Sequence, residues 1–261
     1  MLRFKSLGSG SSGNSTLVEA TEGRHTTRVL IDCGLKIRDL EERLLEAGTS
    51  IQELDAIYIT HEHSDHMGCA RSVLKRHPIP IWMSHGSWLS IQNEQWDSFS
   101  SCFQTARDGV AIEIKNLQLM PFTVPHDARE PLQVCCSNGD RQLGLITDLG
   151  HVTSHVIQAL QNCHAVMLEA NHEPAMLERS KYPLFLKQRV GGNWGHLANA
   201  DSADLLKRIA HPNLSCVVAA HLSERNNTPE LARGHLSGAL GCQPHEIEIA
   251  KPDTGTPWFT V

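Results

Sequence analysis

The stretch from Thr60 to His66, Thr-His-Glu-His-Ser-Asp-His, constrains this chain more than any other feature. It places three histidines and one aspartate within six residues, directly after an apolar run from Leu54 to Thr60. The apolar run predicts a buried β-strand, and Met67 to Arg76 predicts a helix with Ser64 as its N-cap. The stretch therefore lies on a strand-to-helix loop, and its side chains are of the kinds that bind metal ions.

The spacing of these four side chains predicts two metal positions. His61 and His63 are two residues apart on an extended segment, so both imidazoles point to the same side and can reach one ion. Asp65 and His66 lie on the first turn of the helix and face a second position. We expect two ions about 3.5–4 Å apart, as in hydrolytic two-metal sites. The alternative is a histidine-rich surface loop, but the pattern has a chance expectation of only about 0.003 per chain.

Two further candidate ligands follow predicted strands. The strand from Asn116 to Val124 runs into His126. The strand from Gln142 to Thr147 runs into Asp148, and it is the second strand of a hairpin that we predict around the turn signal Asn138-Gly139. Each residue alone is a commonplace loop residue. Because both lie at the C-terminal ends of strands, a sheet edge can bring them to a common point.

Length and composition limit the fold and the location of the chain. With 261 residues and 40% hydrophobic content, we expect a single domain spanning residues 1–261. Strands alternate with helices after a β-rich beginning, which predicts two sheets packed face to face with helices outside. The eight cysteines show no Cys-x-x-Cys spacing and are expected to be buried thiols. No run approaches the ~20 apolar residues of a membrane span, and no signal peptide is recognisable, so we expect a cytoplasmic protein without a membrane partner.

The formal charge of −6 argues against a broad basic surface for gripping nucleic acid. Local clusters of lysine and arginine could still steer a phosphate into a site whose metal ions carry positive charge. The charge therefore disfavours tight, non-specific DNA binding but does not exclude nuclease chemistry.

The pattern His61-x-His63-x-Asp65-His66 after a hydrophobic strand is similar to the signature of the metallo-β-lactamase fold superfamily. Three further stretches resemble its branch of small phosphodiesterases and exonucleases: residues 169–172 (Glu-Ala-Asn-His), 195–197 (Gly-His-Leu) and 220–227. The Gly-His-Leu-Ser motif of that branch has alanine here in place of the serine, at Ala198. The resemblance runs to about Leu231 and implies an α/β fold, a four-layer αββα sandwich with two mixed β-sheets.

The resemblance also implies a full set of metal ligands. The first metal would be held by His61, His63 and His126, the second by Asp65, His66 and His221, and Asp148 would bridge the two. Since every ligand position is filled, a non-catalytic scaffold is disfavoured. Two divalent ions, Zn²⁺, Mn²⁺ or Fe²⁺, would lower the pKa of a bound water and supply hydroxide for hydrolysis at neutral pH.

Asp65 and His196 are predicted as catalytic residues. In the resembling branch the histidine of the Gly-His-Leu motif is not a ligand but faces the scissile phosphate, where His196 would neutralise charge or protonate the leaving oxygen. The alternative for His196 is a loop histidine exposed to solvent. For Asp32, we favour support of the metal-binding loop from behind the ligands over an ordinary turn role.

Residues 8–15 form a Gly/Ser-rich loop that we expect to join two strands as a tight hairpin. The resemblance places this loop beside the active site, where Ser11, Ser12 and Asn14 could contact a substrate phosphate or support the ligands. His172 is a candidate for the same two roles, and a purely structural histidine is an equal alternative.

The resemblance implies a metal-dependent phosphodiesterase that acts on nucleic-acid ends, a 5′-to-3′ DNA exonuclease. The first alternative is a phosphodiesterase for small nucleotides or cyclic phosphates, which the acidic net charge favours. The second is a thioester or lactone hydrolase, which gives no reason for the motif around His196. A chain of 261 residues has no room for the clamping domain of the large RNA-processing members. Loops of the catalytic domain must therefore grip the DNA or nucleotide, and a homodimer stays open.

Overall fold

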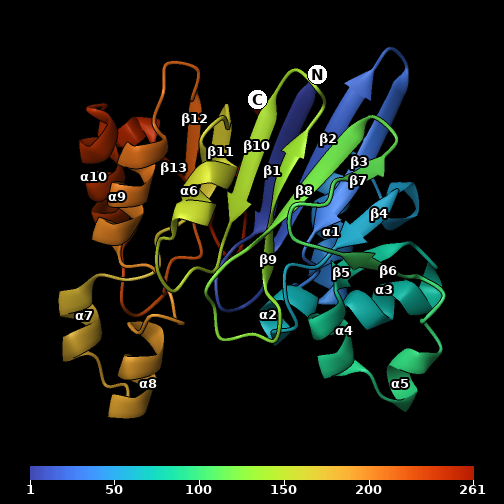
Figure 1. Cartoon of the computed structure of the whole chain (residues 1–261), viewed down its shortest axis with the longest axis horizontal. Coiled ribbons are helices and arrows are strands. Elements are labelled where there is room, and N and C mark those ends of the chain that lie inside the picture. The colour runs from blue at the N-terminus through green and yellow to red at the C-terminus, as the bar shows by residue number, and fades with distance from the viewer.

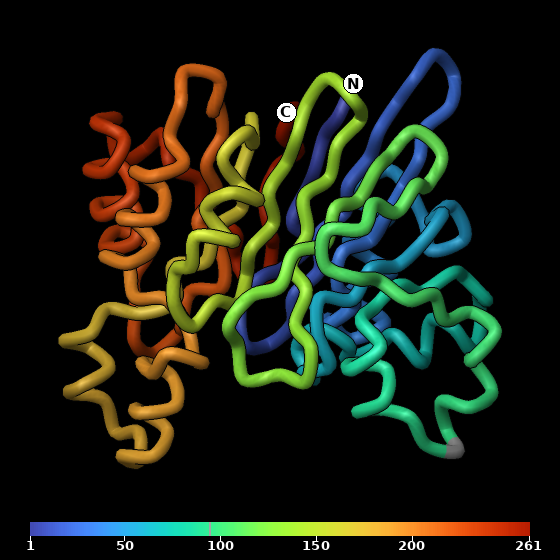
Figure 2. Tube along the Cα trace, viewed as in Figure 1, coloured from blue at the N-terminus to red at the C-terminus, as the bar shows by residue number. Residues whose placement is uncertain are grey.

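The computed structural model describes the whole chain from Met1 to Val261 apart from the side chain of Glu94 (Figure 2). Two seven-stranded sheets form its centre, and helices lie on their outer faces (Figure 1). The apolar residues between the sheets, among them Phe4 and Tyr58 of the first and Leu119 and Met167 of the second, form one buried core. The four-layer αββα sandwich predicted from the sequence is therefore confirmed.

The first sheet has the strand order β14-β1-β2-β3-β4-β5-β6. Strands β1 to β3 pair antiparallel, and β3 to β6 pair parallel. Its strands are β1 (Leu2–Gly8), β2 (Ser15–Glu22), β3 (His25–Ile31), β4 (Ala56–Tyr58), β5 (Ile81–Ser84), β6 (Phe103–Ala106) and β14 (Phe259–Thr260). The parallel half delivers the C-terminal ends of β3 and β4, and hence Asp32 and the His61 loop, to the same edge.

The second sheet has the order β13-β12-β11-β10-β9-β8-β7, with β7 to β10 antiparallel and β10 to β13 parallel. Its strands are β7 (Ile112–Ile114), β8 (Leu117–Thr123), β9 (Leu132–Ser137), β10 (Gln142–Ile146), β11 (Ala165–Glu169), β12 (Cys216–Ala220) and β13 (Glu248–Ile249). The predicted hairpin β9–β10 is present, and Ser137 pairs with Gln142, so a loop of four residues that contains Asn138-Gly139 joins the two strands. The side chain of Asn138 accepts a hydrogen bond from the Arg141 backbone and closes this loop.

The helices cover both outer faces. They are α1 (Ile37–Glu46), α2 (Ser64–Met67), α3 (Ala70–Arg76), α4 (His85–Ile91), α5 (Glu94–Asp97), α6 (Ser154–Leu160), α7 (Pro174–Arg179), α8 (Leu184–Val190), α9 (Asn199–Ile209) and α10 (Pro229–Leu240), with 3₁₀ turns at Ile51–Glu53 and Pro244–Glu246. Helices α1, α3 and α4 pack on the first sheet, and α6, α9 and α10 pack on the second. Within the described residues, no helix is long and apolar enough to cross a membrane.

The predicted helix after the metal motif is broken in two, and Ser64 is not its N-cap. Ser64 is the first residue of α2, and the N-cap is His63, whose side chain caps no backbone amide. The break follows from long-range backbone bonds. The Asp65 carbonyl accepts from the Asn14 amide at 2.7 Å, and the His66 carbonyl accepts from the Cys33 amide at 2.7 Å. These carbonyls are thereby taken from the helical ladder, which ends at Met67.

All eight cysteines are free thiols, as expected from their spacing. Five of them are buried, whereas Cys102, Cys216 and Cys242 are half-buried, so the expectation of buried thiols is too broad for these three. Burial and the neighbouring Glu248 raise the pKa of Cys216 to about 11, which keeps even this less covered thiol protonated at neutral pH.

The close approach of Gly34 to the metal loop generates a stability prediction. A Cβ atom on Gly34 would overlap the backbone carbonyl of Asp65 and lie 2.8 Å from the backbone nitrogen of Asn14. We expect Gly34→Ala to lower the free energy of unfolding by about 1–3 kcal/mol, because backbone atoms must move. A Cβ on Gly238 of α10 meets no atom within 4 Å, so Gly238→Ala should raise stability by up to about 1 kcal/mol. Urea denaturation of both variants checks this, and equal midpoints would contradict it.

Candidate metal centre

The predicted ligands come together from four strand ends and one short helix. His61 and His63 follow β4, Asp65 and His66 lie in α2, and three further ligands follow other strands: His126 after β8, Asp148 after β10 and His221 after β12. The described residues place the ligand atoms of His61, His63 and His126 within 4.8 Å of one another. Those of Asp65, His66 and His221 also lie within 4.8 Å of one another.

Individual distances define the first set. Nδ1 of His63 lies 3.1 Å from Nε2 of His61 and 3.3 Å from Nε2 of His126. Three imidazole nitrogens thus converge on one point, which is the arrangement that a first-row divalent ion accepts. Burial lowers the pKa of His126 and, helped by the charge of His66, lowers that of His61 well below its ordinary value. Both rings are therefore neutral at pH 7, which is the form that binds a metal.

The second set contains a carboxylate and two imidazoles. Oδ2 of Asp65 lies 3.4 Å from Nε2 of His221 and 3.5 Å from Nε2 of His66. Burial alone would lower the pKa of His66 and His221, but nearby carboxylates outweigh it and raise the pKa of His221 to about 10 and that of His66 well above its ordinary value. Both rings therefore hold a proton that a metal must displace.

Asp148 lies between the two sets. Its Oδ2 is 3.0 Å from Nε2 of His66, and its Oδ1 is 3.6 Å from Nε2 of His126. Burial would raise the pKa of Asp148, yet the charges of His221 and His66 hold it well below its ordinary value. Within the described part of the chain, the buried Oδ2 has no hydrogen-bond partner of acceptable geometry. An anionic oxygen that is buried without a hydrogen bond is costly, and a cation beside it would remove the cost.

Each histidine of the two sets is oriented by a protein oxygen at the ring nitrogen that faces away from the centre. These contacts are His61 Nδ1 to Thr60 Oγ1 (3.0 Å), His63 Nε2 to the Asp127 carbonyl (3.2 Å), His66 Nδ1 to Asp32 Oδ2 (2.8 Å), His126 Nδ1 to the Gly195 carbonyl (3.0 Å) and His221 Nδ1 to Glu169 Oε1 (3.1 Å). Metal-binding histidines are usually oriented in this way. The nitrogen and oxygen donors, the orientation of the histidine rings and the unpartnered Oδ2 of Asp148 together fit two divalent ions.

The backbone is strained at two residues of the centre. Asp32 has φ 60° and His221 has φ 54°, in the left-handed region that few residues other than glycine adopt. Asp32 accepts hydrogen bonds from the amide and the hydroxyl of Thr60 and contacts His66, so its conformation is tied to the metal loop. Strain of this kind concentrates at functional sites, where surrounding contacts hold it in place.

The other predicted residues have different surroundings. Asn14 is buried, and its amide nitrogen lies 3.4 Å from Asp65 Oδ2 and 3.2 Å from His66 Nε2, so it is placed to support ligands and not to touch substrate. Ser11 is exposed and lines the cavity at the centre, whereas Ser12 is exposed but does not line it. His172 is buried beside a different cavity, and within the described residues its Nδ1 has no hydrogen-bond partner.

Glu169 is a functional candidate for which sequence reasoning assigned no role. It is fully buried at the end of β11, and its Oε1 lies 2.7 Å from Nδ1 of His196 and 3.1 Å from Nδ1 of His221. Burial opposes its charge, but His196 and His221 lower its pKa below the ordinary value. Asp148, Glu169, His196 and His221 also lie within ligand distance of one another, but the two ring contacts already engage this Glu169 oxygen. The sequence signal that could have identified Glu169 is an acidic residue at the end of a predicted buried strand, as at Asp32.

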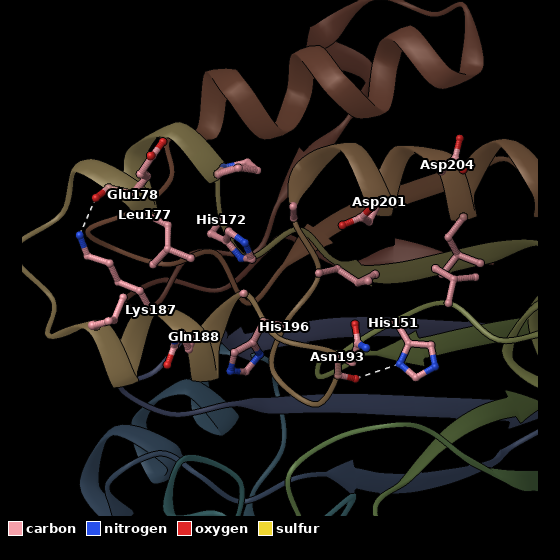
Figure 3. Close-up of a pocket in the computed structure, with 18 of the residues that line it drawn as sticks. His151, His172, Leu177, Glu178, Lys187, Gln188, Asn193, His196, Asp201 and Asp204 are labelled. Carbon is pink, nitrogen blue, oxygen red and sulfur yellow. Dashed lines mark hydrogen bonds between the residues drawn. The ribbon is translucent and has the colours of Figure 1, made fainter.

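Two cavities meet at His196. The metal cavity, about 400 Å³, is lined by Asp65, Asp148 and His221 together with Tyr182 and Arg189 of the segment that carries α7 and α8. The second cavity, about 670 Å³, lies between α7, α8 and α9, and Figure 3 shows His172, Asn193 and His196 on its walls. His196 lines both cavities and is therefore not the exposed loop histidine of the alternative prediction.

Comparison with known proteins agrees with this geometry. The sequence profile of the β-lactamase superfamily domain matches residues 27–221. Exodeoxyribonuclease YycJ of Bacillus anthracis is 30% identical over 239 residues, which cover 92% of this chain and 89% of that protein.

Two solved structures share the fold at low sequence identity. The metallo-β-lactamase fold protein YhfI from Bacillus subtilis has a TM-score of 0.74 and 14% identity over 100% of both chains. Zn²⁺-bound PqqB from Methylobacterium extorquens has a TM-score of 0.74 and 15% identity over 99% of this chain and 100% of that one. The chain therefore belongs to the metallo-β-lactamase superfamily, as a metal-dependent hydrolase of that fold.

Proposed function

We propose that the protein is a two-metal phosphodiesterase that removes nucleotides from DNA ends in the 5′-to-3′ direction. The observation that carries this proposal is His196 on the wall of the metal cavity, paired with the buried Glu169 behind it. A histidine held 2.7 Å from a buried carboxylate supplies a proton donor beside the metals, which ester cleavage with an alkoxide leaving group requires. The name of the Bacillus anthracis relative, an exodeoxyribonuclease, supports a DNA substrate that is attacked at its ends. The 5′-to-3′ direction is what the resemblance of the sequence motifs implies.

Each of the two sets of ligand atoms described above would hold one metal ion. One ion would be bound by His61, His63 and His126, the other by Asp65, His66 and His221, with Asp148 between them. When bound, the ions would lower the pKa of a water molecule and polarise a phosphoryl oxygen. Nitrogen and oxygen donors accept Zn²⁺, Mn²⁺ or Fe²⁺, and the Zn²⁺-bound relative PqqB favours zinc.

His196 would act as the general acid. Burial opposes its protonation, but Glu169 outweighs burial and raises its pKa, which favours the protonated ring that a general acid needs. Because Glu169 engages Nδ1, the proton available for transfer is the one on Nε2. Transfer of that proton would leave a neutral ring that still donates from Nδ1 to the carboxylate. His196 would thus be a general acid that its hydrogen bond to Glu169 holds in position.

Asp65 would act on the side of the phosphate that the water attacks. Burial opposes its charge, but His221 and His66 hold its pKa far below the ordinary value, so the carboxylate stays ionised. Its side chain lines the metal cavity, where the second oxygen can accept a hydrogen bond from the attacking water and orient it. Asp32 and Asn14 would hold His66 and the Asp65 loop in place without touching substrate.

A second candidate is a phosphodiesterase for small nucleotides or cyclic phosphates. A metal cavity of about 400 Å³ suits a mononucleotide, and the net charge of −6 disfavours long polyanions. Metal-loaded protein incubated with end-labelled duplex DNA, single-stranded DNA, RNA, a cyclic nucleotide and bis-p-nitrophenyl phosphate separates the candidates. Stepwise shortening of DNA from its 5′ end supports the proposal, and cleavage of the small esters alone contradicts it. Turnover of thioesters or lactones in preference to any phosphodiester would replace both candidates.

The bridging position of Asp148 predicts loss of metal on neutralisation. Asp148→Asn should lower bound metal from about two equivalents per chain to about one or fewer, because an uncharged amide oxygen cannot compensate two cations. Elemental analysis measures this directly. Asp204→Asn is the matched control, because Asp204 is exposed on α9 beside Arg208. Two full equivalents and normal turnover in Asp148→Asn would exclude the bridging role.

The raised pKa values of His66 and His221 predict that metal binding is linked to proton release. With the pKa of His221 at about 10, both rings are charged at pH 7 without metal, so loading should release about two protons per chain. The apparent affinity should therefore rise with pH from 6 to 8 and fall as the pH is lowered. Calorimetric titration in buffers of different ionisation enthalpy counts the protons, and a count of zero would contradict this electrostatic description.

The proton-donor role of His196 predicts a dependence on the leaving group. His196→Ala should retain both metals and slow hydrolysis of an alkyl phosphodiester by about 10²–10⁴. The loss should be much smaller for a p-nitrophenyl ester, whose leaving group needs no proton. His155→Ala, an exposed histidine on α6, is the control. Equal losses on both esters would leave electrostatic stabilisation as the role, and no loss on either removes His196 from the mechanism.

A further inference from the structure

We propose that the α7–α8 arm, defined as residues 174–190, binds an unpaired strand of nucleic acid and leads it to the metal cavity. This inference rests on the proposed function, because it names how the substrate of that same site is held. Figure 1 shows α7 and α8 beyond the end of the second sheet, away from the layered body. In the described chain, the arm lies next to the metal cavity, where a surface that grips the substrate would have to be.

Helix α8 is covered on neither side. None of its seven residues, all of them within the described part of the chain, is buried. One side, with Leu184 and Lys187, lines the cavity shown in Figure 3, and the other side, with Leu186 and Arg189, lines the metal cavity. Leu184, Phe185 and Leu186 are consecutive and so point to different sides of α8, whereas a surface helix normally keeps its apolar residues on one covered stripe. The open cavities on both sides therefore indicate that α8 is covered by a ligand when the protein works.

The arm exposes large apolar side chains. Leu184 and Phe185 are each 71% exposed, and Trp194, in the loop that follows α8, is 62% exposed. Neighbouring exposed apolar groups such as Leu184 and Phe185 usually mark a binding site. Phe185 and Trp194 offer flat aromatic faces, and nucleobases stack on such faces without regard to sequence.

The charge of the arm selects an anionic partner. Residues 174–190 contain four basic residues and one acidic residue, Glu178, although the chain as a whole carries −6. Over the described residues, Arg179, Lys181 and Lys187 form no ion pair with a carboxylate, and Arg225 adds a cation where it lies 5.9 Å over the Tyr182 ring. Cations interleaved with exposed aromatic groups match the phosphates and bases of a single strand. A second copy of the chain fits less well, because a symmetric contact would bring two identical basic arms together.

The arm is continuous with the metal cavity. Tyr182, Leu186 and Arg189 share the wall of that cavity with Asp65 and His221. Nε of Arg189 lies 2.5 Å from Oδ2 of Asp127, and the Asp127 carbonyl contacts the ring of His63. A strand lying along the arm would therefore present its next phosphate to the metal ligands and to His196.

Fluorescence anisotropy tests the proposal on the metal-loaded protein, with a phosphorothioate-linked probe that resists hydrolysis during the measurement. The probe is a fluorescein-labelled oligothymidylate of about 15 nucleotides. Phe185→Ala should weaken its binding about 5- to 150-fold, the value of one base-aromatic stack. Leu45→Ala is the matched control, because Leu45 on α1 is 68% exposed and should bind as wild type. Lys181→Gln should flatten the slope of log affinity against log salt by about 0.7.

The outcomes separate the arm from the proposed function. Wild-type affinity in Phe185→Ala together with an unchanged salt slope in Lys181→Gln would overturn the proposal, as would a wild type that binds no strand. A dimer in light scattering that Phe185→Ala converts to monomer, with unchanged strand affinity, would make the arm a subunit interface and also overturn it. Failure of the metal-loaded wild type to cleave DNA, with strand binding intact and sensitive to Phe185, would overturn the proposed function alone.

Discussion

The buried carboxylate of Asp148 stands between two sets of imidazoles, and the rest of the centre is arranged to make that placement stable. Together with Asp32, Asp65 and Glu169 it concentrates negative charge at the end of the sandwich. Without cations, this charge holds protons on His66 and His221. Burying so many ionisable groups is costly unless each is paired or coordinated. Two divalent ions can replace the protons on these histidines and neutralise the same carboxylates. The metal-free and metal-loaded proteins would therefore differ mainly in which positive charges lie beside the carboxylates.

The ligand motif could be predicted from the sequence because its geometry is local. Two histidines on an extended segment and two ligands on the next helical turn have fixed directions once the strand and helix exist. The layered fold followed from the alternation of strands and helices. The break in the helix after His66 could not be predicted, because it arises from backbone bonds to Asn14 and Cys33, far away in the sequence. The role of Glu169 was missed for the same reason, since its two histidine partners come from distant loops.

The part of the centre that would face the substrate differs in burial and in charge from the part that would hold the metals. Five of the candidate ligands are buried, His63 and Asp65 are half-buried, and neighbouring oxygens orient the histidine rings, whereas most of the α7–α8 arm is exposed and basic. His196 joins the two regions, because it lines both cavities and is held by Glu169 from the metal side. On the proposed function, local cations and bound metals would provide the attraction for a polyanion that the overall charge of −6 does not.

The central claim is that two metal ions share Asp148 between the two ligand sets, and a crystal structure of the metal-loaded protein tests it most directly. Anomalous difference maps recorded at the absorption edge of the bound metal locate each ion independently of the protein coordinates. We expect two peaks about 4 Å or less apart, one contacting His61, His63 and His126 and one contacting Asp65, His66 and His221. A single peak, or a second peak away from Asp148, would contradict the account.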